Sequence, residues 1–417
     1  MRLGFITFAV ALCFGGTGVV AQQPCHWPCF HGPERTNISP ESGLLDKWPE
    51  EGPSLLWSAE GLGKGYATVS IADGLIFTSG KTGQRTFVYA FDMDGHLVWK
   101  APNGQSWETD RQWARSYDGA RSTPTWDDGV VYHLGELGRL AALDAKYGAE
   151  LWAVELRERY EAEIPEYGYS ESVYIEGDRL FVCPAGEEAY MVCLDKKTGT
   201  EIWRNDQIPG HVGFSSLMPF EYGGYSQLAG MSSTTVFGVD ATTGKLLWSI
   251  PFANSRDNNV ADPLFSDGEV IVSSGYGRGT MKFRLLEDGS RFDTEILWDT
   301  ELMDNHHGGV ILREGYLYGA GHNNRGWFCL DAATGEQQWN AQGKGSLILA
   351  DGMLYCLDER GTVTLVKADP EAYRETGRFQ VPEGGTGMHW AHPVVCGGRL
   401  YIRYDDRLFV YHVSENP

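Results

Sequence analysis

The chain has 417 residues, among them 53 glycines, with a 12% aromatic fraction and a formal net charge of −22 at pH 7. This acidic balance argues against nucleic acids and anionic membranes as partners, because both would be repelled. The glycine-rich and aromatic composition, without long helical periodicity, favours many short strands joined by tight turns.

The first residues match the pattern of an export signal. Met1 and Arg2 precede an apolar run over 3–14, and a small-residue stretch ends at Ala21. We therefore predict a signal peptide over 1–21, and Leu12 before Cys13 favours cleavage over lipid attachment. No other stretch approaches the about 20 apolar residues of a membrane span. We expect an exported protein, periplasmic or extracellular, without a transmembrane segment, in which residues 22–53 form an N-terminal extension.

A short module repeats along the rest of the chain and is clearest over residues 192–203. An alternating apolar run ends in Asp195, a Thr-Gly turn follows, and a second apolar run ends in Trp203. This pattern indicates a β-hairpin with a glycine at positive φ. Related copies lie at 142–152, 239–248 and 329–339, with looser ones at 91–99 and 284–298.

A second hairpin precedes each of these modules and is marked by an acidic or glycine pair between two β-rich runs. Eight such markers occur, at 73–74, 128–129, 177–178, 223–224, 267–268, 314–315, 351–352 and 397–398. Two hairpins give four antiparallel strands, and eight units of about 40 to 55 residues are typical of a β-propeller.

The two ends of the chain predict how the ring closes. The last unit stops after its third strand, whereas residues 55–57 carry a terminal Trp without a preceding Asp turn. We therefore predict an all-β fold, an eight-bladed propeller over residues 54–417, whose N-terminal strand completes the eighth blade and removes an open sheet edge. The seventh blade has Phe379 in place of the usual Trp.

Loops between the second and third strands and crossovers between blades share one face of such a propeller. Nearly all polar residues that the repeat does not require lie in these loops, so we predict a binding site on this face. The candidate ligand-binding residues are Arg115, Arg121, Tyr169, Glu171, Asn305, His306, His307, Arg325, His389, Trp390, His392 and Arg403.

Several of these residues have competing interpretations. His306, His307 and His392 are candidate general bases near neutral pH, or structural histidines that bond to loops. No metal site is predicted, because adjacent residues that enter a strand point to opposite faces. Arg115, Arg121 and Arg325 would clamp an anion or pair with the acids of an acidic protein. Tyr167, Tyr169 and Trp390 would serve a carbohydrate-binding propeller as sugar platforms.

The cysteines outside the predicted signal peptide are odd in number, which leaves at least one unpaired thiol in an oxidising compartment. Cys25 and Cys29 are four residues apart, and we expect them to form a small loop disulfide. Cys183 and Cys193 are candidates for pairing across a hairpin.

The sequence also carries a recognisable repeat signature, Leu-Asp-x-x-Thr-Gly-x-x-x-Trp, over residues 194–203 and 330–339. With this signature the mature chain resembles the bacterial exported propellers of PQQ-type repeats, the quinoprotein alcohol dehydrogenase-like superfamily. Residues 27–33, 305–309, 390–393 and 406–411 are similar to one exported branch of that superfamily.

The resemblance implies two kinds of function. Quinoprotein dehydrogenases hold PQQ over a calcium ion, often beneath two adjacent cysteines, whereas BamB-like propellers are interaction scaffolds without a cofactor. This sequence has no adjacent cysteine pair. We therefore expect a scaffold that binds an exported protein, a glycan or a small molecule.

Two alternatives remain open. The first is a PQQ-dependent dehydrogenase that oxidises an alcohol or a sugar, with PQQ and calcium as cofactors, an arginine on the PQQ carboxylates and one of the three histidines as base. The second is a carbohydrate-binding propeller.

Overall fold

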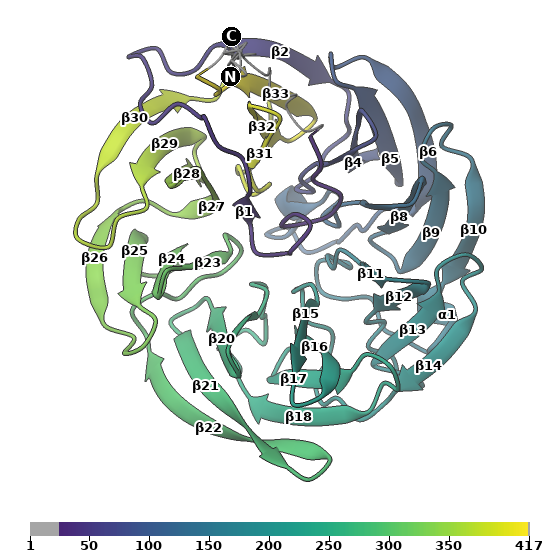
Figure 1. The fold of residues 1–417 in the computed structure, drawn as a ribbon. Helices are drawn as coiled ribbons and strands as arrows, with labels where there is room; N and C mark the ends of the chain where they lie inside the picture. The colour runs from purple at the N-terminus through teal and green to yellow at the C-terminus, as the bar shows by residue number, and fades with distance from the viewer. Residues whose placement is uncertain (1–24, 416–417) are drawn as a thin grey trace, which may run out of the picture.

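The computed structural model describes residues 25–415, so the predicted signal peptide lies outside the described residues. Eight sheets surround a central axis (Figure 1), which confirms the predicted eight-bladed propeller. Within the described range, no helix has the length and apolar character needed to cross a membrane.

Each blade contains four antiparallel strands, numbered from the axis outward in the first seven blades. Blades one to four contain β3 (Ser70–Ala72), β4 (Leu75–Thr82), β5 (Arg85–Asp92), β6 (Leu97–Gln105); β7 (Thr125–Asp127), β8 (Val130–Leu134), β9 (Arg139–Asp144), β10 (Glu150–Glu155); β11 (Tyr174–Glu176), β12 (Arg179–Val182), β13 (Met191–Asp195), β14 (Glu201–Asn205); β15 (Met218–Tyr222), β16 (Tyr225–Met231), β17 (Thr235–Asp240) and β18 (Leu246–Pro251).

The remaining blades follow the same order. Blades five to eight contain β19 (Leu264–Ser266), β20 (Glu269–Ser274), β21 (Gly279–Asp288), β22 (Arg291–Thr300); β23 (Val310–Arg313), β24 (Tyr316–Ala320), β25 (Gly326–Asp331), β26 (Gln337–Gln342); β27 (Gly345–Ala350), β28 (Met353–Asp358), β29 (Thr362–Lys367), β30 (Glu375–Gln380); β31 (Val394–Cys396), β32 (Arg399–Tyr404), β33 (Arg407–His412) and β2 (Leu55–Glu60). Two short helices, η1 (Arg115–Tyr117) and α1 (Leu156–Arg159), lie in loops, and β1 (Ile38–Ser39) precedes the ring.

The ring closes through β2, which pairs antiparallel with β33 at the outer edge of blade eight. Trp57 lies opposite Val410 and Ala59 opposite Leu408. The predicted closure by an N-terminal strand is therefore confirmed, and each sheet in the ring is complete.

The repeated tryptophans join neighbouring blades. Trp152 at the outer strand of blade two donates from Nε1 to the carbonyl of Lys196, in the Thr-Gly turn of blade three. Gly199 of that turn has a φ of +67°, and a Cβ there would lie 2.9 Å from the Trp152 ring. Only glycine satisfies both the positive φ and this close contact, so the turn and the Trp act as one inter-blade joint.

Blade seven replaces its Trp with Phe379, and the N-terminal extension compensates for the change. Trp48 of the extension is 3% exposed and packs edge-on against Phe379, with ring centroids 5.4 Å apart. Tyr411 lies 4.6 Å from the other side of Phe379. The extension thus provides the indole that the blade itself lacks.

The rest of the extension crosses the end of the central channel, as the dark segment near the middle of Figure 1 shows. Trp27 exchanges backbone hydrogen bonds with Ile71 of blade one. Arg35 donates to the carbonyl of Ser172 at the start of blade three. Strand β1 then runs parallel to β27 of blade seven. These contacts with blades around the ring make the extension a plug.

The cysteine pairing differs from the sequence prediction. Cys25 bonds to Cys396 of blade eight, 371 residues away, and the predicted partner Cys29 is a buried free thiol. Cys183 and Cys193 are also free and buried, so the predicted pair across that hairpin is wrong as well. The plug brings Cys25 to β31 in space, which spacing along the chain does not indicate.

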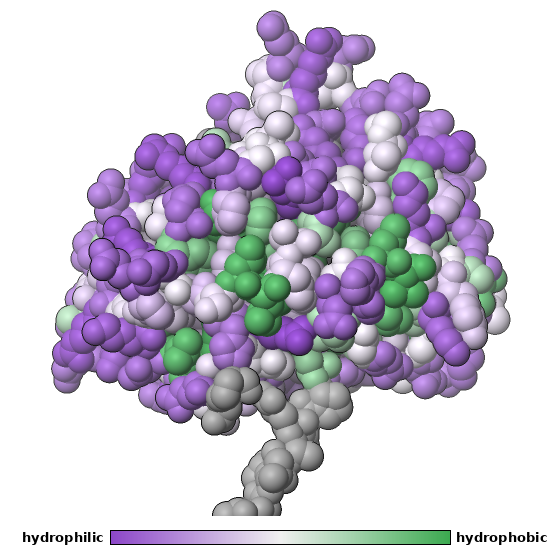
Figure 2. Space-filling view, turned by 90° about the horizontal axis from the view of Figure 1, so that it is seen from above, coloured by the Kyte–Doolittle hydropathy of each residue, from purple (hydrophilic) through white to green (hydrophobic). Residues whose placement is uncertain are grey.

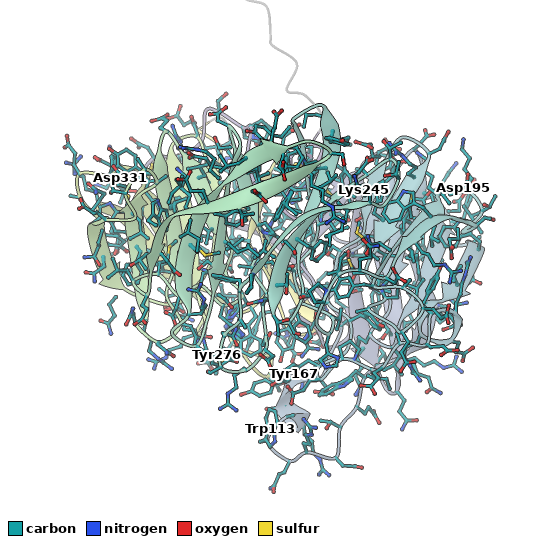
Figure 3. All side chains as sticks on the ribbon, turned by 90° about the horizontal axis from the view of Figure 1, so that it is seen from below. Trp113, Tyr167, Asp195, Lys245, Tyr276 and Asp331 are labelled. Atoms are coloured by element: carbon teal, nitrogen blue, oxygen red, sulfur yellow. A yellow bond between two sulfur atoms is a disulfide. The ribbon has the colours of Figure 1, made fainter. Side chains whose placement is uncertain are left out.

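The two faces of the ring differ in character. Asp195, Lys245 and Asp331 lie at hairpin turns on one face, whereas Trp113, Tyr167 and Tyr276 lie on the crossover face (Figure 3). The side view in Figure 2 shows a largely hydrophilic wall with separate apolar patches. Exposed apolar side chains of the outer strands include Leu55, Leu56, Leu97 and Val98.

Candidate functional site

A cavity of about 600 Å³ lies at the centre of the crossover face. All eight crossovers between blades contribute to its lining, and the plug contributes Phe30 and His31. The main polar and aromatic lining residues are Phe30, His31, Tyr66, Trp113, Tyr117, Arg121, Glu166, Tyr167, Ser170, Asn258, Arg256, Asp262, Tyr276, His306, His307, His322, Arg325, Lys344, Glu359, Trp390 and His392.

Trp390 lies within an aromatic cluster on one side of this cavity. Tyr117 stacks on its indole with centroids 5.5 Å apart and an interplanar angle of 21°. Tyr66 and His307 lie 5.1 Å and 5.0 Å from the same ring. The indole Nε1 donates to Glu359 at 3.0 Å. These rings and the bond to Glu359 therefore hold the Trp390 indole in one position.

The acids that line the cavity are each paired. Glu359 accepts the Trp390 bond and forms a 3.0 Å ion pair with Lys344. Glu166 pairs with Arg111 at 2.5 Å. Because these carboxylates are matched by nearby donors, the acidic charge of the chain as a whole does not extend into this site.

Arg121 supports the loops of the site. Its guanidinium donates at 3.0 Å to the carbonyls of Gly119 and Tyr167, and also bonds the carbonyl of Tyr117. The rings of Tyr66, Trp107 and Tyr167 surround it at 5.3 to 5.9 Å. Burial lowers the pKa of Arg121. Its donors are used by backbone carbonyls, which makes it a positioning group.

Arg256 and Arg325 differ from Arg121, because their guanidinium groups are not used by neighbouring residues of the described chain. Both side chains are exposed at the cavity, and neither guanidinium has an ion-pair or hydrogen-bond partner among residues 25–415. Burial raises the pKa of Tyr276, and the positive charge of Arg256 opposes that rise. We call Arg256 and Arg325 the mouth arginines.

Strained backbone marks the same part of the cavity. Tyr276, Arg325 and His31 have φ values of +58°, +45° and +65°, in the left-handed region that is costly for residues with a Cβ. Such conformations cost about 1 to 3 kcal/mol each and cluster at functional sites. The structure therefore holds three lining side chains in place against a local preference.

Two histidines lie beside Tyr276, and a third, His307, lies beside one of them, with its ring centroid 5.3 Å from that of His306. The ring of Tyr276 is 4.9 Å from His306 and 4.6 Å from His322. Burial lowers the pKa of His306 to about 3 and also lowers that of His307 and His322. Within the part of the chain that the structure describes, no group of three His, Cys, Asp or Glu side chains could hold a metal ion. Because their pKa values are lowered, His306, His307 and His322 are neutral at pH 7.

A hydrogen-bonded chain forms the floor of the cavity. His392 Nε2 lies 2.6 Å from the carbonyl of His307, and its Nδ1 lies 2.9 Å from His31 Nε2. Nδ1 of His31 lies 3.2 Å from Asp262. A carbonyl requires a proton on His392 Nε2, so the neutral ring accepts from His31. His31 thus donates from Nε2, and its Nδ1 faces the Asp262 carboxylate.

The predicted site residues divide into two groups. Arg121, His306, His307, Arg325, Trp390 and His392 line the cavity. Arg115 is exposed on the same face but does not line it. The structure does not bring the remaining five into the cavity: Tyr169, Glu171, Asn305, His389 and Arg403.

These five residues have structural partners. Arg403 bonds the carbonyls of Gly63 and Ser79, and His389 stacks on Tyr404. The other three bond to backbone: Tyr169 to the Pro184 carbonyl at 2.7 Å, Glu171 to the Cys183 amide at 2.8 Å and Asn305 to the Ala320 carbonyl at 2.9 Å.

Three residues of the cavity, His31, Asp262 and Trp113, were not among the predicted site residues. His31 belongs to the motif over 27–33, which was the one available signal. Asp262 is an ordinary acid in a crossover, and its role follows only from the position of the plug. Trp113 is 56% exposed in the long loop between β6 and β7, at the projecting tip in Figure 3.

PQQ and calcium, which the fold family implies, do not fit this cavity. Calcium takes several oxygen ligands, yet Asp262, Glu166 and Glu359 are paired with His31, Arg111 and Lys344. Among the described residues, no cysteine lines the cavity. The disulfide joins the plug to β31, and the free cysteines are buried elsewhere. The Trp390 ring is already stacked on Tyr117.

Comparison with known proteins identifies the repeats. A family model described as "Outer membrane protein assembly factor BamB" matches residues 84–341. The quinohemoprotein alcohol dehydrogenase ADH-IIG of Pseudomonas putida is 30% identical over 155 residues, which cover 34% of this chain and 20% of that enzyme. The match thus spans about a fifth of that relative's length.

Solved structures share the fold at low sequence identity. Quinohemoprotein alcohol dehydrogenase from Comamonas testosteroni has a TM-score of 0.66 at 14% identity, covering 95% of this chain and 81% of its own. BamB from Moraxella catarrhalis has a TM-score of 0.60 at 15% identity, covering 87% and 98%. These likenesses show the fold alone.

Proposed function

Since the chain belongs to the family described as outer membrane protein assembly factor BamB, we propose that it is an exported, non-catalytic binding protein that holds a small ligand in the crossover-face cavity. A PQQ-repeat propeller of this kind is related both to quinoprotein dehydrogenases and to BamB. The residues of the cavity favour binding over redox chemistry.

The observation that carries the proposal is the convergence of all eight crossovers and the plug on one cavity. Its volume of about 600 Å³ falls within the about 300 to 1,000 Å³ of small-molecule sites. The plug closes one end of the channel, so the cavity is a pocket with a floor and one open mouth.

The protonation of the site supports a non-catalytic role. A general acid or base works best with a pKa near the operating pH. Burial holds the pKa of His306 and of His392 at about 3. Both ring nitrogens of His392 are already engaged, by His31 and by the His307 carbonyl. We assign these residues to shaping the pocket.

A substitution that fills the cavity tests this proposal. Val260 lines the cavity, and Val260→Trp would fill it, whereas Val98→Trp adds the same bulk at an exposed site on β6. Saturation-transfer NMR with a mixture of benzoates and monosaccharides should give signals with the wild type and with Val98→Trp, and lose them with Val260→Trp. Thermal melts check that each variant is folded.

Two results would count against the proposal. Signals that persist in a folded Val260→Trp variant would place the binding elsewhere, and the absence of any wild-type signal would remove the binding role. Titration with PQQ and calcium, followed by absorbance, tests the dehydrogenase alternative directly. Saturable PQQ binding that Val260→Trp abolishes would favour that alternative over a non-catalytic protein.

A further inference from the structure

We infer that the ligand of this cavity is an acidic saccharide, a sugar that carries carboxylate or sulfate groups, with its anionic group on the mouth arginines. This inference rests on the proposed function and names the ligand class of the same site. Three features of the cavity support it: unpaired cations, exposed aromatic faces and unsatisfied polar atoms.

The cations that line the cavity differ from what the acidic charge of the whole chain would suggest. The chain has a formal charge of −22, so its cations would be expected to pair with acids. Arg256 and Arg325 have no such partner among the described residues, whereas the lining acids Glu166 and Glu359 are each paired. A free guanidinium can bind a carboxylate or sulfate through two parallel N–H bonds, and two such groups line this cavity.

Both mouth arginines share the cavity with aromatic lining residues. Arg256 lies on the crossover before β19, and Arg325 lies in the loop between β24 and β25, which also carries His322. The ring of His322 is 4.6 Å from that of Tyr276. An anion on either arginine would thus be held at the same cavity as these rings.

The aromatic side chains of the mouth are suited to a sugar ring. Trp113 is 56% exposed, and its ring lies 6.2 Å from that of Tyr167. An aromatic face is apolar with a negative quadrupole, and it packs against the C–H face of a pyranose. An exposed indole on a projecting loop is costly to hydrate, and a ring stacked on it would remove that cost.

Two residues of the cavity lining carry buried polar atoms without a hydrogen-bond partner. Asn258 is 8% exposed, and its Oδ1 has no hydrogen-bond partner. Ser170 Oγ is likewise buried without a partner. A buried polar atom left unpaired costs about 1 to 3 kcal/mol. Sugar hydroxyls both donate and accept, so a saccharide satisfies these atoms, whereas a plain inorganic anion lacks donors.

The test compares the binding of an acidic disaccharide with that of its uncharged methyl ester. Isothermal titration calorimetry would use digalacturonate, its dimethyl ester and a sulfated galactose disaccharide. We expect digalacturonate or the sulfated sugar to bind at least about tenfold more tightly than the ester, the scale of one charge-assisted hydrogen bond. The preferred acid distinguishes a uronate from a sulfate ester. Higher salt should reduce the difference.

Matched variants assign the anion to the mouth arginines. In Arg256→Ala/Arg325→Ala the acid and the ester should bind equally. Arg115→Ala removes an exposed arginine of the same face that does not line the cavity, and it should behave as the wild type. Equal binding of acid and ester by the wild type, or an unchanged acid preference in the double variant, would overturn the inference.

The remaining outcomes separate the inference from the proposed function. If neither digalacturonate nor the sulfated disaccharide binds while the benzoate and monosaccharide mixture still occupies the cavity, the ligand class is wrong and the binding role stands. If the mixture also fails, both are wrong.

Discussion

Nε2 of His31 in the plug lies 2.9 Å from Nδ1 of His392 in the last crossover, which links the start of the ring to its end. Because the His307 carbonyl fixes the proton of His392, His31 donates from Nε2 and turns its Nδ1 toward Asp262. The floor of the cavity thus brings the plug against an acid of the crossover before blade five, although the two are far apart in sequence.

Asp262→Asn tests this contact. Asp262 is 9% exposed, its Oδ1 accepts the Ser216 amide at 2.6 Å, and its Oδ2 lies 3.2 Å from His31. A hydrogen bond to a charged group contributes about 1.5 to 3 kcal/mol. Removing the carboxylate charge should therefore lower the free energy of unfolding in urea by about 1 to 2 kcal/mol.

Asp267→Asn is the control for that change, because Asp267 is an exposed turn residue at positive φ, where Asn is well tolerated. It should leave the unfolding free energy within about 0.5 kcal/mol of the wild type. An Asp262→Asn variant as stable as the wild type would show that this contact does not stabilise the floor of the cavity.

The covalent tie of the plug gives a second prediction. Cys25 and Cys396 close a loop of 371 residues, and cross-linking a long loop stabilises a protein by about 2 to 4 kcal/mol. Reduction with dithiothreitol should lower the free energy of unfolding by that amount. The Cys25→Ser/Cys396→Ser variant should start at the lower value and no longer respond to the reductant.

Reductant sensitivity that persists in this double variant would contradict the assigned pairing. Cys29→Ser offers a further control, because Cys29 is a free thiol in the same plug. That variant should remain fully sensitive to reduction.

The repeats could be predicted from sequence because each blade is determined locally. Asp195 accepts the amides of Lys197 and Thr198, a contact within one turn that the module itself encodes. The eighth blade was equally accessible, since an orphan Trp57 at one end matched a missing strand at the other. Hairpin periodicity and turn residues suffice for such features.

The plug and the inner lining could not be predicted in this way. Spacing suggests Cys29 as the partner of Cys25, yet Cys396 arrives only through the closed ring. Arg403 and Arg325 both appear in sequence as arginines of crossover-face loops. Packing alone shows that carbonyls of blade one bind Arg403 while Arg325 remains unpaired. Which side chains point inward depends on the tertiary structure.

Glu171 gives a pH-dependent prediction. It is 2% exposed, and burial raises its pKa to about 8, while the Cys183 amide bond opposes the shift. The folded protein therefore holds a proton that the unfolded chain releases near its usual pKa. The resulting stability is present below the unfolded pKa and is lost as pH rises through about 8.

Glu171→Gln mimics the protonated acid, keeps an oxygen for the Cys183 amide and does not titrate. The variant should gain stability relative to the wild type as pH rises from 5 to 8, by up to about 1.4 kcal/mol per pH unit. Urea unfolding at several pH values measures the difference. Glu187→Gln, at an exposed site in the next loop, should show no such trend. A constant difference between Glu171→Gln and the wild type across this range would show that Glu171 is already ionised in the folded protein.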